Sequence, residues 1–158
     1  MQNKILFFLF FLIFCSKSFS DEQFTFNVSK IEILENGNKI VGTDRGIITS
    51  DSGIIIEADN FEYSKKNNFL EVNGDIVIKN QDKDYIIYAE NISYLKNENI
   101  IFAKDRIKFI DSDKKIITSN NFSYDVNKNI FKANNNVEII DLIKNYNIKS
   151  ENISYIKN

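Results

Sequence analysis

The side chains that could do chemistry in this 158-residue sequence are carboxylates, lysines and tyrosines, because it contains no histidine. Histidine is the commonest general base near neutral pH and the commonest metal ligand. Without it, neither a Ser–His–Asp nor a Cys–His arrangement can be assembled. The single cysteine, Cys15, lies within the first twenty residues. The composition therefore argues against an enzyme, and we expect no cofactor.

Two pairs of carboxylates, Asp82 with Asp84 and Asp111 with Asp113, are close enough in sequence to suggest a calcium site. Calcium loops in proteins combine several oxygen ligands with a glycine at a fixed spacing. Neither pair lies in such a loop, so the pattern favours solvated carboxylates over a metal site.

Lysines gather in two polar stretches, Lys65-Lys66 and Lys114-Lys115, which could attract the phosphates of a lipid. Solvated turns are the simpler interpretation. Across the whole chain the formal net charge is −2 and the pI is about 5.3. A protein that binds nucleic acid without sequence preference needs a basic surplus, so this class is excluded.

The first twenty residues have the three-part pattern of a secretory signal peptide. Lys4 supplies the positive start, and an apolar run extends from Ile5 to Phe14. Small residues in Ser18-Phe19-Ser20 then precede a predicted cleavage point before Asp21. The apolar run is shorter than the roughly 20 residues of a membrane-spanning helix. We therefore expect residues 1–20 to be removed on export, with a retained anchor as the alternative.

The rest of the chain repeats a unit of about thirty residues. One half-motif has an isoleucine at its second position, alanine or serine at its fourth, an asparagine at its sixth and a tyrosine at its ninth. It occurs at residues 55–63, 86–94, 116–124 and 147–155. A second half-motif follows at 70–78, 101–109 and 131–139. The tyrosines Tyr63, Tyr94, Tyr124 and Tyr155 are 31, 30 and 31 residues apart, which indicates a true structural repeat.

Each half-motif is predicted to be a β-strand. Apolar and polar residues alternate, so that Leu70, Val72, Ile76 and Ile78 share one face and Glu71 lies on the other. Between Ala58 and Phe61 the alternation slips by one residue, and it slips again between Ala89 and Ile92. A bulge or corner at these points would keep the apolar residues on one face. Short polar turns join the strands.

Two all-β architectures fit these units. The first is an open roll of two antiparallel sheets built from two-strand units. The second is a β-solenoid with one coil per unit, in which an asparagine ladder would run through the repeats. The asparagines that would form that ladder are Asn60, Asn91, Asn121 and Asn152. The short turns between strands of similar length favour the antiparallel roll.

The repeated motifs resemble those of the OstA-like family of lipopolysaccharide transport. Its members include the periplasmic bridge protein LptA, the related LptC and the periplasmic N-terminal domain of the translocon LptD. The fullest copies of the family pattern are residues 55–63 and 72–78, and the stretch 42–48 is similar to the family's opening units. The resemblance covers the chain from about Phe24 to the end.

The resemblance implies a fold, a cellular location and a set of partners. The family fold is a twisted, slightly open roll of two antiparallel sheets, also described as a β-jellyroll. Members bind the acyl chains of lipopolysaccharide or lipid A in the interior, and they join other OstA-like domains by pairing edge strands. We thus expect a periplasmic OstA-like domain at residues 21–158, associated with the outer membrane and its translocon.

The candidate lipid-binding residues are the apolar side chains that the alternation places on the inward face. Any two-sheet protein needs such residues, so a purely structural core is the competing interpretation. The four tyrosines are expected to form a packing column. The inward set comprises Ile56, Ala58, Phe61, Ile76, Ile87, Ala89, Ile92, Ile107, Phe109, Ile117, Phe122 and Val137.

The sequence thus favours a periplasmic lipopolysaccharide-binding bridge that shields acyl chains on the way to the outer membrane. The alternative is an exported structural or adhesive β-repeat protein without a lipid ligand. The row of units stops after the first half of a unit, at Tyr155 to Asn158. Either the last strand is an open edge for a partner, or the sequence is the front part of a longer translocon protein.

Overall fold

The computed structural model describes residues 24–80 and 82–156, and the predicted signal peptide lies outside this part of the chain. The described residues form ten β-strands and one short 3₁₀ turn, η1 (Glu35–Gly37). The strands are β1 (Phe24–Leu34), β2 (Lys39–Ser50), β3 (Ile54–Ala58), β4 (Asn60–Ser64), β5 (Phe69–Asn80), β6 (Tyr85–Leu95), β7 (Ile100–Asp111), β8 (Lys115–Asp125), β9 (Ile130–Asp141) and β10 (Tyr146–Ile156).

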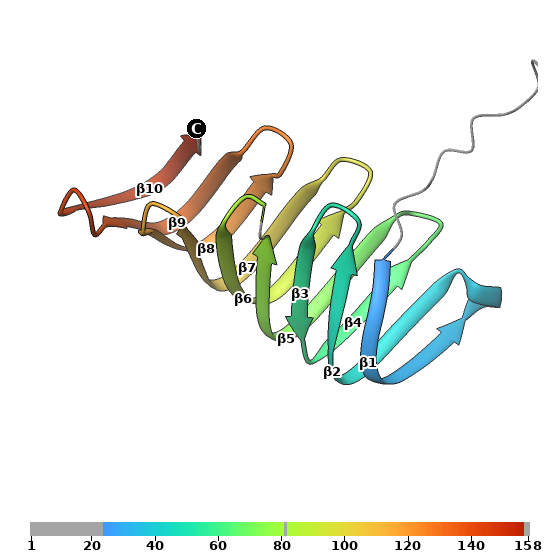
Figure 1. The fold of residues 1–158 in the computed structure, drawn as a ribbon. Coiled ribbons are helices and arrows are strands. Elements are labelled where there is room, and N and C mark those ends of the chain that lie inside the picture. The colour runs from blue at the N-terminus through green and yellow to red at the C-terminus, as the bar shows by residue number, and fades with distance from the viewer. Residues whose placement is uncertain (1–23, 81, 157–158) are drawn as a thin grey trace, which may run out of the picture.

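All ten strands belong to one antiparallel sheet in which neighbours in sequence are neighbours in space (Figure 1). The strands β3 and β4 together occupy one place in the row, since both pair with β2 and with β5. The predicted antiparallel roll is confirmed, and the alternative solenoid is wrong. Asn60 and Asn91 both pair with Asn73 of β5, so an antiparallel strand separates them.

Each long strand bends in its middle, where the pairing register shifts. The shift between β5 and β6 falls at Asn73/Ile76, and the next falls at Tyr88/Asn91. Two consecutive residues with positive φ lie at the corners of β2, β5, β7 and β9, as Gly74 (82°) and Asp75 (39°) illustrate. The predicted corner at residues 59–60 is also present, as the break between β3 and β4. These bulges fold the sheet into two walls that meet along the line of corners, which we call the spine.

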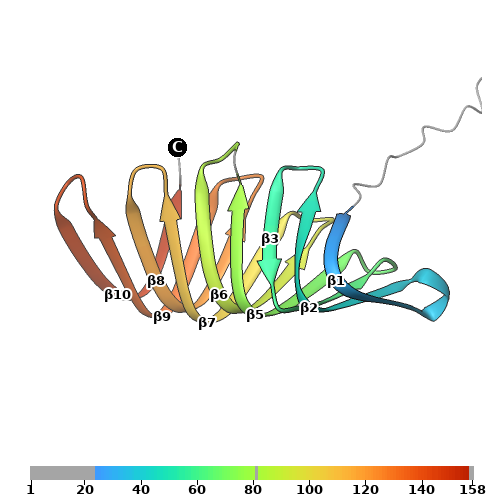
Figure 2. The ribbon, with the colours of Figure 1, turned by 60° about the horizontal axis from the view of Figure 1, so that its bottom comes forward.

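Figure 2 shows the two walls facing each other. The buried apolar cluster draws its side chains from both walls. We call one wall the tyrosine wall, because it carries Tyr63, Tyr94, Tyr124 and Tyr155. It consists of the strand segments 30–34, 39–43, 61–64, 69–73, 91–95, 100–104, 121–125, 130–134 and 152–156. The opposite wall consists of 24–28, 46–50, 54–58, 76–80, 85–89, 107–111, 115–119, 137–141 and 146–150.

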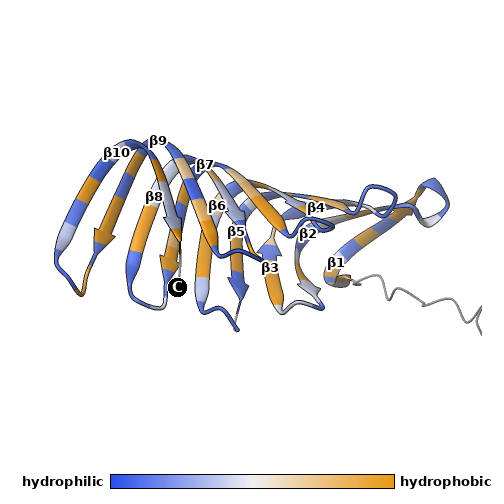
Figure 3. Cartoon of the chain, turned by 90° about the horizontal axis from the view of Figure 1, so that it is seen from above, coloured by the Kyte–Doolittle hydropathy of each residue, from blue (hydrophilic) through white to orange (hydrophobic). Residues whose placement is uncertain are grey.

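The core lies between the walls, and hydropathy alternates along the strands as a half-buried sheet requires (Figure 3). Leu70, Val72, Ile76 and Ile78 of β5 are buried, as their shared face predicts, whereas Glu71 is exposed. Burial of each such side chain stabilises the fold by about 1.5–3 kcal/mol. Among the described residues no helix is long and apolar enough to cross a membrane.

Candidate lipid-binding interior

All twelve predicted interior residues belong to one buried cluster. Their exposed fractions range from 0% for Ile87 and Phe109 to 6% for Ala89. They come from both walls, because the corners turn both halves of each strand inward. The sequence therefore identified the inward face correctly. Whether these residues bind lipid stays a prediction, since the same burial suits a structural core.

Aromatic rings pack in two groups inside the interior, one toward β1 and one toward β10. Toward β1, Phe26 stacks on Phe61 with ring centroids 5.0 Å apart. Toward β10, Tyr124 stacks on Phe131 at 4.0 Å, and Tyr85 meets Tyr124 edge-on at 5.0 Å from the opposite wall. Burial raises the pKa of both Tyr85 and Tyr124, so each stays a neutral phenol. These rings bring the walls into direct contact.

A hydrogen-bonded ladder runs along the rim of the tyrosine wall, by which we mean the edge formed by the turns between its strands. Each of three tyrosines donates its hydroxyl to the asparagine five residues later. The pairs are Tyr63–Asn68 at 3.0 Å, Tyr94–Asn99 at 2.5 Å and Tyr124–Asn129 at 3.0 Å. These asparagines have positive φ, between 48° and 54°, which asparagine tolerates better than most residues. The four tyrosines lie in register along the wall, but Leu70, Ile101 and Phe131 are paired between them, so the column is a mixed one. Three of the tyrosine hydroxyls hold the turns.

Adjacent turns of this rim are also joined to each other. The side chain of Asn68 donates to Asn97, and that of Asn99 donates to Asn127. The backbone N–H of Val126 donates to the carbonyl of Asn99 at 2.9 Å. The asparagine ladder of this fold thus lies in the turns, not at the positions that a solenoid would use.

The rim of the opposite wall has a second polar ladder. Its members are buried, end their strands and accept a backbone N–H from the following turn. They lie 30 or 31 residues apart, so this signal is present in the sequence. The four residues are Ser50, Asn80, Asp111 and Asp141.

The opening between the two rims, opposite the corners, is here called the mouth of the interior. Three sets of contacts bridge the rims and close it. Near β1, the ring of Phe24 lies 5.0 Å from that of Tyr63, with the Lys96 ammonium 4.8 Å above the Phe24 ring. In the middle, Lys83 donates across the mouth to the carbonyl of Val126 and to Asn129.

The third bridge lies near β10. There Tyr155 donates its hydroxyl to Asp111 at 3.1 Å, and Lys115 lies 3.9 Å from the same carboxylate. Burial alone would lower the pKa of Lys115, but hydrogen bonds to Asp113 and Tyr155 outweigh it and raise the pKa. Lys115 is thus held by two aspartates, whereas Lys65 and Lys66 are exposed in their turn, as predicted.

The interior remains accessible at the two ends of the row. At the β1 end, Ile31 and Ile33 point inward but are 45% and 66% exposed. At the β10 end, Tyr146 and Ile148 also point inward and are 38% and 47% exposed. Within residues 24–80 and 82–156, each end strand pairs with a single neighbour, which leaves one edge of its backbone unpaired there. A chain that paired with β1 or β10 would therefore lie directly beside these exposed apolar side chains.

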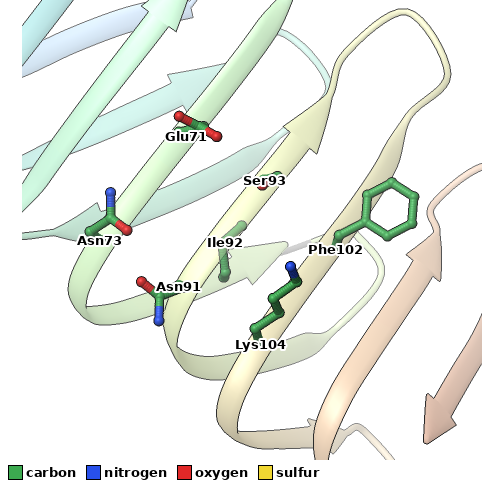
Figure 4. Close-up of a pocket in the computed structure, with 7 residues that line it drawn as sticks. All are labelled: Glu71, Asn73, Asn91, Ile92, Ser93, Phe102 and Lys104. Carbon is green, nitrogen blue, oxygen red and sulfur yellow. The ribbon is translucent and has the colours of Figure 1, made fainter.

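The outer face has several open hollows, one of which is shown in Figure 4. The volume of this hollow is about 220 Å³, below the roughly 300 Å³ at which ligand pockets begin. Side chains from three strands line it, including Glu71 of β5, Ser93 of β6 and both Phe102 and Lys104 of β7. It contains no activated nucleophile, so this arrangement does not suggest catalysis.

No metal site is evident in residues 24–80 and 82–156, where no three histidine, cysteine, aspartate or glutamate side chains come together. Of the carboxylates considered for calcium, Asp111 instead accepts the backbone N–H of Lys115 at 2.9 Å. Asp113 accepts the ammonium of the same lysine. These two aspartates therefore stabilise a turn and a rim contact.

Comparison with solved structures identifies the class of fold. The chain is similar to LptH from Pseudomonas aeruginosa, described as the LptA-homologous periplasmic component of the conserved lipopolysaccharide transport device. The TM-score is 0.66, and the match covers 87% of this chain and 96% of LptH at 15% identity. No family model and no curated protein matches the sequence. The chain thus has an LptA-type, OstA-like fold, as its repeats predicted.

Proposed function

We propose that this chain is a periplasmic lipopolysaccharide-binding bridge domain that shields acyl chains between the inner and outer membranes. The observation that carries the proposal is an apolar interior that runs the length of the roll and stays accessible at both ends. Every methylene removed from water contributes about 0.8 kcal/mol, so such an interior favours acyl chains strongly. LptH, which has the same fold, is described as part of a lipopolysaccharide transport device.

Acyl chains can bind only if the two walls move apart. The interior side chains are packed against one another, and rim contacts close the mouth at three places. Only the corners connect the walls covalently, since each strand passes from one wall to the other there. Opening about the spine would expose the inward isoleucines to lipid without breaking the pairing between strands.

The unpaired edges of β1 and β10 provide the route to partners. Exposed edges are normally suppressed because they pair with other chains. Here both edges carry accessible inward apolar residues, so strand addition would join one interior to the next. We propose other OstA-like domains, including that of the outer-membrane translocon, as the partners.

Photo-crosslinking in cells tests this function. A photoreactive residue at position 76 or 107 replaces an inward isoleucine and should capture lipopolysaccharide. The same residue at position 71 replaces the outward Glu71 and should not. A purely structural or adhesive repeat protein would give no lipid adduct at any of these positions, and that result would refute the proposal.

A further inference from the structure

The turn between β9 and β10, at one end of the row of strands, exposes two large apolar side chains (Figure 1). Leu142 is 60% exposed and Ile143 is 66% exposed, and the two are adjacent in sequence. Neither belongs to the buried cluster between the walls. A single exposed apolar residue needs no explanation, but an adjacent pair on one turn is a candidate contact site.

The architecture does not require apolar residues in this turn. Each of the four turns on this rim follows a member of its polar ladder. The two residues after the ladder are polar in the first three turns, at 51–52, 81–82 and 112–113, and they are Leu142 and Ile143 in the last. Polar turns therefore serve the same hairpins, and formation of the hairpin does not explain the apolar pair.

The residue before the turn holds it in one shape. The carboxylate of Asp141 accepts the backbone N–H of Ile143 at 3.0 Å and that of Lys144 at 2.7 Å. Asp141 itself is only 2% exposed, and Asn145 completes the turn with a φ of 54°. The apolar pair is thus presented by an ordered turn, which lowers the entropy lost when it binds.

Exposed cations lie beside the apolar pair. Strands β8 and β9 pair Lys115 with Asp141, so Lys114 and Leu142 are the next residues beyond that pair. Lys114 and Lys144 are both exposed, and within residues 24–80 and 82–156 neither side chain forms an ion pair. The exposed aspartate of the neighbouring turn is bonded to Lys115. The unpaired charges around the apolar pair are therefore positive.

A lipid bilayer fits this turn better than a second protein does. A stable protein interface needs roughly 800 Å² and 20–30 residues from each partner, far more than two side chains at the end of a hairpin supply. Strand addition would cover the edge of residues 146–156 and leave the turn beyond the end of the added strand. Aliphatic side chains flanked by lysines suit a membrane surface, where ammonium groups stay at the headgroups.

From these observations we infer that Leu142 and Ile143 insert into the surface of an anionic phospholipid bilayer, with Lys114 and Lys144 at its headgroups. The contact is weak and reversible, since even a whole myristoyl chain binds membranes only marginally. It places the β10 end of the roll against a membrane. The inference does not depend on what the interior binds, so it stands apart from the proposed function.

Vesicle flotation tests the inference with residues 21–158, which include every described residue. The vesicles are phosphatidylcholine with or without phosphatidylglycerol, and the wild type should bind the anionic vesicles about tenfold more strongly. Leu142→Ser with Ile143→Ser should reduce binding at least about tenfold, whereas Leu142→Ile with Ile143→Leu should retain it. Lys114→Gln with Lys144→Gln should remove the preference for phosphatidylglycerol.

Two controls test whether this turn is the contact. Ile33→Ser with Leu34→Ser removes a comparable pair, 66% and 43% exposed, at the other end of the row and should not change binding. The sequence has no tryptophan, so Ile143→Trp adds a single reporter that brominated acyl chains should quench. Ser52→Trp, at the corresponding position between β2 and β3, should not be quenched.

Three results would overturn the inference. The first is equal flotation of the wild type and the double serine variant. The second is equal quenching of the two tryptophan reporters. The third is a wild-type dimer that the double serine substitution abolishes while neither protein binds vesicles, because the turn would then contact a second copy of the chain. Unchanged circular dichroism of the double serine variant would show that its loss of binding does not come from unfolding.

Discussion

Gly42 in β2 has no side chain, so the ring of Phe61 on the neighbouring strand β4 lies against the Gly42 backbone. It pairs with Phe61 of β4, and the Phe61 ring lies directly over it. A Cβ atom added at Gly42 would lie 2.0 Å from Cε1 of Phe61 and 2.2 Å from Cζ. Non-bonded carbon atoms prefer a separation of about 3.5–4.0 Å. Gly42→Ala therefore forces the ring to move by about 1.5 Å.

The ring has little room to move. Phe61 is 3% exposed and stacks on Phe26 at 5.0 Å, with an angle of 13° between the ring planes. Overpacking of this kind costs about 1–3 kcal/mol, and the rigid stack places Gly42→Ala at the upper end. We expect Gly42→Ala to lower the free energy of unfolding by about 3 kcal/mol, measured by urea denaturation followed by circular dichroism.

A double-mutant cycle identifies the cause. Phe61→Ala alone should cost about 3–5 kcal/mol. Once the ring is absent, Gly42→Ala should cost less than about 1 kcal/mol, which gives a coupling of about 2 kcal/mol or more. The outward substitution Thr43→Ala on the same strand serves as the control and should cost under about 1 kcal/mol. Additive costs for Gly42→Ala and Phe61→Ala would refute the argument from steric contact.

Three other substitutions test the rims. Asn99→Ala removes the acceptor of the Tyr94 hydroxyl and places alanine at a φ of 54°, so it should cost about 2–3 kcal/mol in urea denaturation, with Asn99→Gly milder. Backbone N–H groups of Lys144 and Ile143 hold the pKa of Asp141 below its usual value. Its ionised form thus stabilises the fold above about pH 4, and this contribution fades as the pH falls further. Asp141→Asn should consequently flatten acid denaturation below about pH 4, and an unchanged profile would contradict the assignment. Tyr155→Phe loses the hydrogen bond to Asp111, so amide hydrogen exchange in β10 should become faster while β5 stays protected. Equal exchange rates in β10 of the wild type and of Tyr155→Phe would show that this contact does not hold the last strand.

The strands and their inward faces could be predicted because they depend on local alternation. The period of two placed Leu70 and Ile76 inward and Glu71 outward, and the slip between Ala58 and Phe61 predicted the corner. The thirty-residue period alone did not distinguish between the two architectures. An antiparallel roll and a solenoid share it, and strand direction depends on turn geometry that polar stretches of three or four residues barely specify.

The contacts across the mouth could not be predicted, because they join residues far apart in sequence and in different units. Lys83 contacts Asn129, and Tyr155 contacts Asp111, which is 44 residues away. No spacing rule relates such pairs, since their meeting depends on the angle between the walls. The polar rim that contains Asn80 and Asp111 was predictable in principle, because its members repeat every 30 or 31 residues.

The central claim is that acyl chains lie between the two walls, and the isoleucines of the chain allow a direct measurement. Neighbouring isoleucines on one strand face opposite sides: Ile87 and Ile117 are buried inside, whereas Ile86 and Ile116 lie on the outer face. Intermolecular nuclear Overhauser contacts from lipid A acyl protons to labelled isoleucine methyl groups distinguish these sides. We predict contacts to Ile87 and Ile117 and none to Ile86 and Ile116. Contacts to the outer methyl groups, or to no isoleucine in a lipid-bound sample, would contradict the account.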